Sequence, residues 1–154
     1  MKKTYLLILI TSTVISCKSI PDFEYSKLTK TDTIYKLDMS NRNLKEQPNL
    51  SGYTIVDLNL SNNKILDFNE TFLPKGVQKI NLSNNKLKAF HCQKTIIQNL
   101  NLSNNLLTTV QMPLYYDIKA DTLNFAVNKD LETKSWAFPK FYKTVINHSI
   151  STKN

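Results

Sequence analysis

The chain has 154 residues, of which 41% are hydrophobic and 21% charged, and this size and composition predict one folded domain. They exclude a wholly disordered chain and a protein with many membrane spans. With only two glycines, the chain also lacks the glycine-rich loops that hold phosphates, because those loops need residues that adopt positive φ. Enzymes that act on nucleotides are therefore disfavoured.

The formal net charge of +8 predicts a mild attraction to anionic partners, such as lipid headgroups or an acidic polysaccharide. The lysines are spread along the sequence and are not interleaved with aromatic residues. We therefore predict a solvated cationic surface without a recognition patch, and no nucleic-acid partner.

The beginning of the chain has the pattern of an export signal. Lys2 and Lys3 precede an apolar stretch, residues 5–15, which at about 11 residues is too short to span a bilayer as a helix. The stretch ends in Val-Ile-Ser-Cys, residues 14–17, which resembles the lipobox of bacterial lipoproteins. The resemblance implies a signal peptide, residues 1–16, that is removed before Cys17, and an acylated Cys17. The alternative is an ordinary secretory signal with an unmodified Cys17.

Acylation of Cys17 would anchor the chain in the lipid of a bacterial envelope membrane. The next residue is Lys18 and not the aspartate that resembles an inner-membrane retention signal, so the resemblance implies the outer membrane. Whether the chain faces the periplasm or the cell surface stays open. Acylation would also leave Cys92 without a disulfide partner, and we expect Cys92 to be buried and not to act as a nucleophile.

Residues 34–128 contain five copies of a short motif. The copies recur at a nearly constant interval, and an apolar residue stands three positions before each copy. They are LDMSNRNL (37–44), LNLSNNKI (58–65), INLSNNKL (80–87), LNLSNNLL (100–107) and the degenerate LNFAVNKDL (123–131). This LxLxxNxL motif, with an interval inside the range of about 20–29 residues, resembles leucine-rich repeats. The resemblance implies an α/β-type leucine-rich repeat solenoid of about five coils, with a short, curved parallel sheet.

The alternation in LxL predicts strands with one buried face, so that pairs such as Leu58 and Leu60 point inward. Prolines in the returning segments predict a convex side that is irregular or 3₁₀, not helical. Phe68, Phe90 and Val110, each three residues after a motif copy, predict a second apolar stripe against the convex side, which Gln47 interrupts in the first coil. Arg42 replaces the motif asparagine in the first copy, which predicts a solvated turn or an altered turn around Asn43. The motif asparagines, which we expect to bond backbone groups of the turns as a structural ladder, are Asn63, Asn85, Asn105 and Asn128.

Both ends of a solenoid need caps, because an open end would expose its apolar core. We assign residues 17–33 to the lipidated cysteine, a tether and an N-terminal cap, and residues 129–146 to a C-terminal cap. Aromatic residues concentrate in the second cap, at Trp136, Phe138, Phe141 and Tyr142. The alternative is that these side chains form an exposed binding patch. Residues 147–154 are expected to be a flexible tail.

Leucine-rich repeat proteins usually bind ligands on the concave sheet, so the resemblance implies a site at the outward strand positions. Side-by-side asparagines could instead bond to one another and leave a solvated ladder without a ligand. Only Tyr35 lies near enough to stack on a sugar ring. The candidate binding residues are Lys36, Asp38, Asp57, Asn59, Lys79, Asn81, Asn99, Asn101, Thr122 and Asn124.

No catalytic, metal-binding or cofactor-binding constellation is present in the sequence. We therefore expect a non-enzymatic binding or interaction module, tethered to a bacterial envelope membrane, that contacts a protein partner of unknown identity through its concave face. Two alternatives stay open. One is a structural or accessory lipoprotein without a specific ligand, and the other is a lipoprotein that binds a surface polysaccharide.

Overall fold

The computed structural model describes residues 30–93, 95, 97–112, 120–131 and 142–146. The predicted signal peptide, Cys17, most of the N-terminal segment and the tail lie outside the described residues. Of the predicted C-terminal cap, residues 132–141 also lie outside them, and with these Trp136, Phe138 and Phe141.

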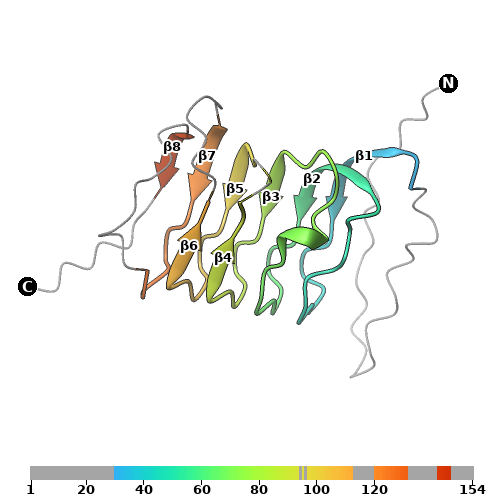
Figure 1. Cartoon of the computed structure of the whole chain (residues 1–154). Coiled ribbons are helices and arrows are strands. Elements are labelled where there is room, and N and C mark those ends of the chain that lie inside the picture. The colour runs from blue at the N-terminus through green and yellow to red at the C-terminus, as the bar shows by residue number, and fades with distance from the viewer. Residues whose placement is uncertain (1–29, 94, 96, 113–119, 132–141, 147–154) are drawn as a thin grey trace, which may run out of the picture.

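The backbone winds into a solenoid with one parallel strand in each turn (Figure 1). Six strands pair in the order β1-β2-β3-β5-β7-β8, and every pairing is parallel. The strands are β1 (Thr33–Asp38), β2 (Thr54–Asn59), β3 (Lys79–Asn81), β5 (Asn99–Asn101), β7 (Ala120–Asn124) and β8 (Tyr142–Ile146). The predicted parallel sheet is therefore confirmed. It continues through β8 into the segment assigned to the C-terminal cap, one strand beyond the five motif copies.

The convex side carries more regular structure than the sequence predicts. A single 3₁₀ turn, η2 (Glu70–Phe72), follows β2, and no α-helix occurs among the described residues. Two further strands, β4 (Ala89–His91) and β6 (Thr109–Gln111), pair in parallel as a second small sheet. Both have a buried central residue between two more exposed ones. The expected non-helical side is confirmed, but it is not irregular throughout.

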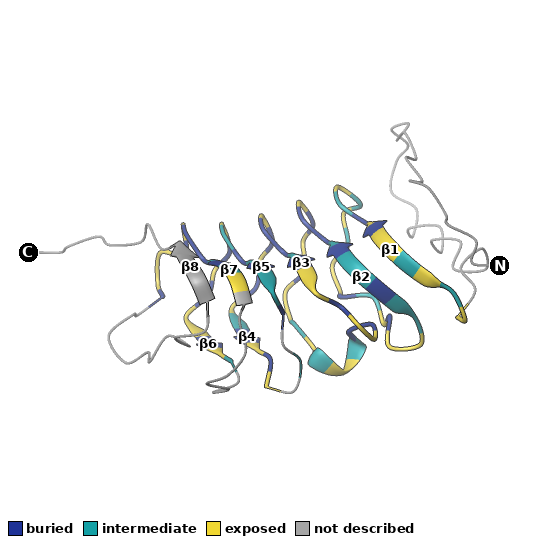
Figure 2. Cartoon of the chain, turned by 90° about the horizontal axis from the view of Figure 1, so that it is seen from above, coloured by how far each residue is buried: buried dark blue, intermediate teal, exposed yellow. Residues whose placement is uncertain are grey.

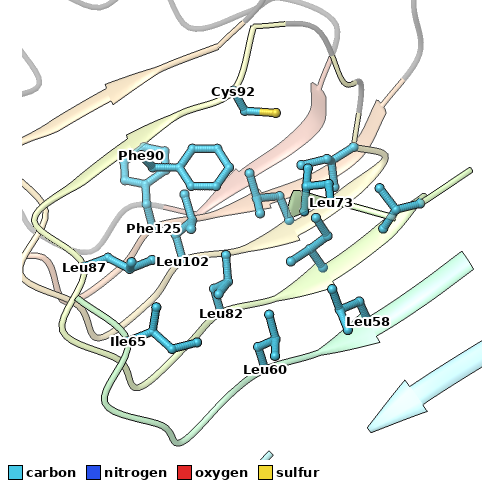
Figure 3. Close-up of a cluster of buried hydrophobic side chains, with 14 of the residues drawn as sticks. Leu58, Leu60, Ile65, Leu73, Leu82, Leu87, Phe90, Cys92, Leu102 and Phe125 are labelled. Carbon is cyan, nitrogen blue, oxygen red and sulfur yellow. The ribbon is translucent and has the colours of Figure 1, made fainter. Parts of the chain in front are cut away.

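The core lies between the two sheets and is filled by the motif's apolar positions (Figure 3). The inward leucines and isoleucines of β2, β3 and β5 are at most 2% exposed, as their alternation predicts. Burial of each such side chain contributes about 1.5–3 kcal/mol. On the convex side the rings of Phe68 and Phe90 pack with their centroids 4.3 Å apart.

Gln47, which interrupts the apolar stripe, is buried and fully bonded to the next coil. Its Nε2 donates to the Asn69 carbonyl at 3.1 Å, and its Oε1 accepts from the Asn69 amide at 2.8 Å. A buried amide costs little when both of its groups are paired. Gln47 therefore replaces an apolar contact between the first two coils by two hydrogen bonds.

Each motif asparagine ties the turn of its own coil to the preceding coil. The Nδ2 of Asn105 donates to the carbonyls of Leu82 and Leu102, both at 3.0 Å, and its Oδ1 accepts from the Leu87 amide at 3.1 Å. Equivalent bonds from Nδ2 to carbonyls and from a preceding amide to Oδ1 occur at Asn63, Asn85 and Asn128. All four side chains are at most 7% exposed.

The turns require a left-handed residue at one position. Asn41, Asn62, Asn84 and Asn104 adopt φ between 54° and 57° there, a conformation that asparagine tolerates. The fifth copy has Val127 at this place with φ of 60°, which costs a β-branched residue about 1–2 kcal/mol. In the first copy Asn43 also has positive φ, at 58°. The turn beside Arg42 is therefore altered around Asn43.

Replacing Asn105 by alanine should lower the free energy of unfolding by about 2–4 kcal/mol, because the Leu87 amide and two buried carbonyls would lose their partner. Urea denaturation followed by circular dichroism measures this loss. Asn62→Gly is the matched control, since Asn62 is exposed with φ of 55° and glycine accepts positive φ, and it should change stability by about 0.5 kcal/mol or less. Equal losses in the two variants would contradict the structural role of Asn105.

Candidate functional site

The outward positions of the six-stranded sheet form the face that we call the concave face. Strand register brings all ten candidate residues onto it in two rows. The first row contains Lys36, Asp57, Lys79, Asn99 and Thr122, which are successive partners across the strands. The central row, two positions later in each strand, contains Asp38, Asn59, Asn81, Asn101 and Asn124.

The central asparagines are oriented by bonds within their own coils. The Oδ1 of Asn81 accepts from both the amide and the hydroxyl of Ser83, at 3.0 and 2.8 Å. Asn101 is held in the same way by Ser103, and the Oδ1 of Asn124 accepts from the Ala126 amide. With the oxygen engaged, the Nδ2 groups of these three asparagines remain as donors on the concave face.

This arrangement corrects the alternative of a ladder in which neighbouring asparagines bond to one another. Along the central row, the described bond between strands is from Asn59 Nδ2 to Asp38 Oδ1, at 3.1 Å. A bond between equivalent asparagines occurs instead in the turns, where Asn104 donates to Asn84. The reason is local, because the residue two positions later offers an amide at shorter reach than the next coil does.

The free donors border a shallow hollow of about 280 Å³ on the concave face. Ile80 and Leu100 line it, and so do two charged residues, Asp57 and Lys79. The remaining lining residues are Asn81, Asn99, Asn101, Thr122 and Asn124. The lining that β3, β5 and β7 give to this hollow therefore carries no charge beyond Lys79 and is rich in hydrogen-bond donors. It is suited to a partner that presents carbonyl or carboxylate oxygens.

Asp38 occupies the asparagine row at the first strand and differs from its neighbours in charge. Burial tends to raise the pKa of its carboxyl group, but hydrogen bonds from Ser40 and Asn59 and the charge of Lys36 together outweigh burial and lower that pKa below 3.8. The Ser40 amide lies 2.9 Å from Asp38 Oδ1. An aspartate therefore makes the same bond to residue i+2 that the asparagines make.

Asp38 should make the stability of the protein depend on acid pH. Because its folded-state pKa is lowered, its contribution is present above the unfolded value of 3.8 and is lost as the pH falls through the folded value. Asp38→Asn keeps the turn but cannot titrate. Urea unfolding at pH 7 and pH 3 should show a larger acid-induced loss for the unchanged protein than for this variant. Identical losses would contradict the assignment.

Cys92 is fully buried on the convex side, beside the buried apolar side chains (Figure 3). It also contacts a carboxylate, that of Glu70. Its Sγ lies 3.4 Å from Glu70 Oε1 and 3.3 Å from the Thr95 carbonyl. Burial, then the negative charge of Glu70 and the hydrogen bond to it, raise the pKa of the Cys92 thiol far above its usual value. Glu70 also accepts from the amides of Gln93 and Thr95, so it holds the loop of the following coil.

A thiol in this environment should be inert in the folded protein. In the chain with Cys17→Ser, Cys92 is the only remaining cysteine, and a disulfide reagent at pH 8 should react with it only when denaturant is added. Absorbance of the released thiolate measures the reaction. Rapid reaction of the folded chain would show that Cys92 is accessible and would contradict its burial.

Other site chemistries find no support in the part of the chain that the structure covers. No group of three or more His, Cys, Asp or Glu side chains is placed to hold a metal ion among the described residues. His91 is exposed on β4, next to the buried Cys92. Within the same residues, no helix has the length and apolar character that crossing a membrane requires.

Comparison with known proteins supports the repeat architecture. Tsukushi of Gallus gallus, a leucine-rich repeat protein, is 36% identical over 117 residues, a match that covers 62% of this chain and 32% of Tsukushi. The fold is that of a leucine-rich repeat solenoid. The chain spans about a third of the length of Tsukushi, and the two share repeats and not a whole protein. No protein-family model and no solved structure matches the chain.

The sequence pattern predicts the residues of the concave face, but it does not indicate which side-chain atoms those residues present to a partner. The Asn-x-Ser spacing of the repeats is the signal that could have shown it, since an asparagine side chain often accepts from the amide two residues later. No local signal pointed to Glu70. Its partners, the amides of Gln93 and Thr95, belong to the next coil and are distant from Glu70 in the sequence.

Proposed function

We propose that this protein is a non-enzymatic interaction module that binds a protein partner through its concave face. The observation that carries the proposal is the fixed orientation of Asn81, Asn101 and Asn124, whose oxygens are engaged and whose Nδ2 donors are left for a partner. Leucine-rich repeat architecture and the similarity to Tsukushi support a binding role. A partner that presents backbone carbonyls or acidic side chains would pair with these donors.

A substitution of asparagine by aspartate removes the donors of the concave face while it keeps the accepting oxygens. Asn→Asp at positions 81 and 101 keeps the oxygen that accepts from Ser83 and Ser103, as Asp38 already does for Ser40. It replaces both outward donors by acceptors with negative charge. Each lost hydrogen bond weakens binding by about 0.5–1.5 kcal/mol, so the double variant should lose about tenfold in affinity or more.

The matched control is Asn49→Asp with Gln111→Glu, which makes the same change in net charge at exposed positions outside the concave face. Each chain would be expressed in its native host, crosslinked mildly and used to capture partners from the envelope. We expect the same partner with the unchanged chain and the control, and its loss with the concave-face variant. Equal capture by all three would move the site elsewhere, and no capture by any would favour an accessory lipoprotein without a specific ligand.

We further propose that acylated Cys17 tethers this module to a bacterial envelope membrane, with the outer membrane as its location. The support is the sequence of residues 1–17, with its basic start, its apolar stretch and Val-Ile-Ser before the cysteine. Mass spectrometry of the mature chain should find an N-terminal peptide that begins at an acylated Cys17. A peptide with an unmodified Cys17, or a different N-terminus, would contradict the tether.

Aromatic residues contribute little to the described part of the concave face, which disfavours the polysaccharide alternative. Sugar rings are commonly bound by stacking on aromatic faces, and Tyr35 on β1 lies outside the lining of the hollow. The row of amide donors can still bond hydroxyl oxygens. We therefore expect that added envelope polysaccharide does not displace the captured partner. Displacement would favour the polysaccharide alternative.

A further inference from the structure

The turns that follow β1, β2, β3, β5 and β7 lie in a row along one edge of the solenoid (Figure 1). We call this row the turn edge. It comprises residues 41–46, 62–67, 84–88, 104–108 and 127–130. Backbone bonds connect adjacent turns, for example from the Lys64 amide to the Leu44 carbonyl and from the Lys86 amide to the Ile65 carbonyl. Side chains of successive coils, which are distant in the sequence, therefore become neighbours.

Stacking gathers positive charge on the turn edge. The half-buried Arg42 and five exposed lysines lie there, with three carboxylates, those of Glu46, Asp67 and Asp130. The concave face is balanced by comparison, with two lysines and two aspartates. The sequence predicts a cationic surface without a patch, yet residues that are dispersed along the chain share one edge after folding. The lysines of the turn edge are Lys45, Lys64, Lys86, Lys88 and Lys129.

The same edge exposes apolar side chains. Four large hydrophobic residues are exposed in the described part of the chain, and three of them, Leu66, Leu106 and Val127, belong to the turn edge with 48–52% exposure. Leu106 occupies the repeat position that Lys64 and Lys86 hold in the two preceding coils. Val127 occupies the left-handed position that asparagine fills in the other four turns. Figure 2 shows exposed residues recurring along this row.

We propose that the turn edge docks on an anionic lipid surface. Lysines at such a surface are attracted by its negative potential, and each strengthens binding about fivefold when it lies within a Debye length. The exposed apolar side chains of the turn edge favour a lipid bilayer over a dissolved polyanion as the anionic partner. A bilayer offers acyl chains below its headgroups to Leu66, Leu106 and Val127, whereas a dissolved polyanion offers only charge.

This docking would set the orientation of the module. The strands run toward the turn edge, so they would stand upright on the membrane, and the concave face would stay open to the side (Figure 1). The inference is independent of the concave-face partner and of the acylation of Cys17, because it concerns an edge that neither one uses.

The test measures co-sedimentation of the full chain carrying Cys17→Ser with vesicles of phosphatidylcholine, alone or mixed with phosphatidylglycerol. Vesicles of phosphatidylcholine alone report any binding by the apolar residues 5–15. The edge variant replaces Lys64, Lys86 and Lys88 by glutamine. The matched control makes the same replacement at the exposed Lys36, Lys75 and Lys79, which lie away from the turn edge, and has the same net charge.

We expect the edge variant to bind the anionic vesicles at least about tenfold more weakly than the control, with the difference shrinking as salt is added. Equal weakening of both variants would show that only net charge matters and would overturn the proposal.

A second variant, Leu106→Gln with Val127→Asn, tests the lipid assignment. Asparagine suits the backbone of position 127, so this substitution should not unfold the turn. We expect a severalfold loss of vesicle binding that persists at high salt. Unchanged binding would mean that the edge attracts polyanions in general, and it would overturn the assignment to a lipid surface.

Discussion

Stacking of one coil on another depends on a buried asparagine side chain in the turn of each motif copy after the first. The chain must reverse direction at the end of every strand, and this leaves amides and carbonyls turned toward the core, where water cannot satisfy them. Asn85 and Asn105 each supply one acceptor to an amide of the preceding coil and donate to carbonyls of both coils. These bonds satisfy the backbone groups that face the core, so successive coils can pack closely against one another.

The surfaces of the protein follow from this stacking. Equivalent residues of successive coils lie side by side, because the strands pair in register. One outward position of each strand therefore forms a row of polar side chains, and the successive turns form a row that carries lysines. Asn81 and Asn101 are equivalent by repeat, and so are Lys64 and Lys86. The concave face presents polar atoms in fixed directions, whereas the turn edge presents long cationic side chains and apolar ones. The first is suited to a specific partner and the second to a surface without fixed geometry.

Much of this architecture could be predicted from the sequence, because the five motif copies show which residues of successive coils are equivalent. The spacing of the motif copies predicts the parallel strands, and the alternation of apolar and polar residues in LxL predicts the inward leucines. The pairing of β4 with β6 was not predicted, because Phe90 and Val110 alone indicate an apolar stripe and the three-residue strands around them are too short to show an alternation. The sequence shows Gln47 only as an interruption of the apolar stripe. Its hydrogen bonds could not be predicted, because its partner Asn69 belongs to the next coil and is distant in the sequence.

The candidate site was predicted less completely than the fold. Sequence pattern indicates which residues point outward, but not which end of an amide faces the partner, and that is decided by the bond to the residue two positions later. The gathering of lysines on the turn edge was not predicted, because spacing along the chain does not show which residues become neighbours when the coils stack. Aligning the five copies would have shown lysine recurring at positions 64, 86 and 129.

Hydrogen exchange in the unmodified protein tests the asparagine-based stacking most directly. The amides of Ile65, Leu87 and Leu107 lie in turns yet donate to asparagine oxygens of the next coil, each at 3.1 Å. They should exchange as slowly as the amide of Leu82, which directly follows β3 and donates to the Asn101 carbonyl at 2.8 Å. Exchange as fast as that of exposed turn amides would contradict the claim that these asparagines hold the coils together.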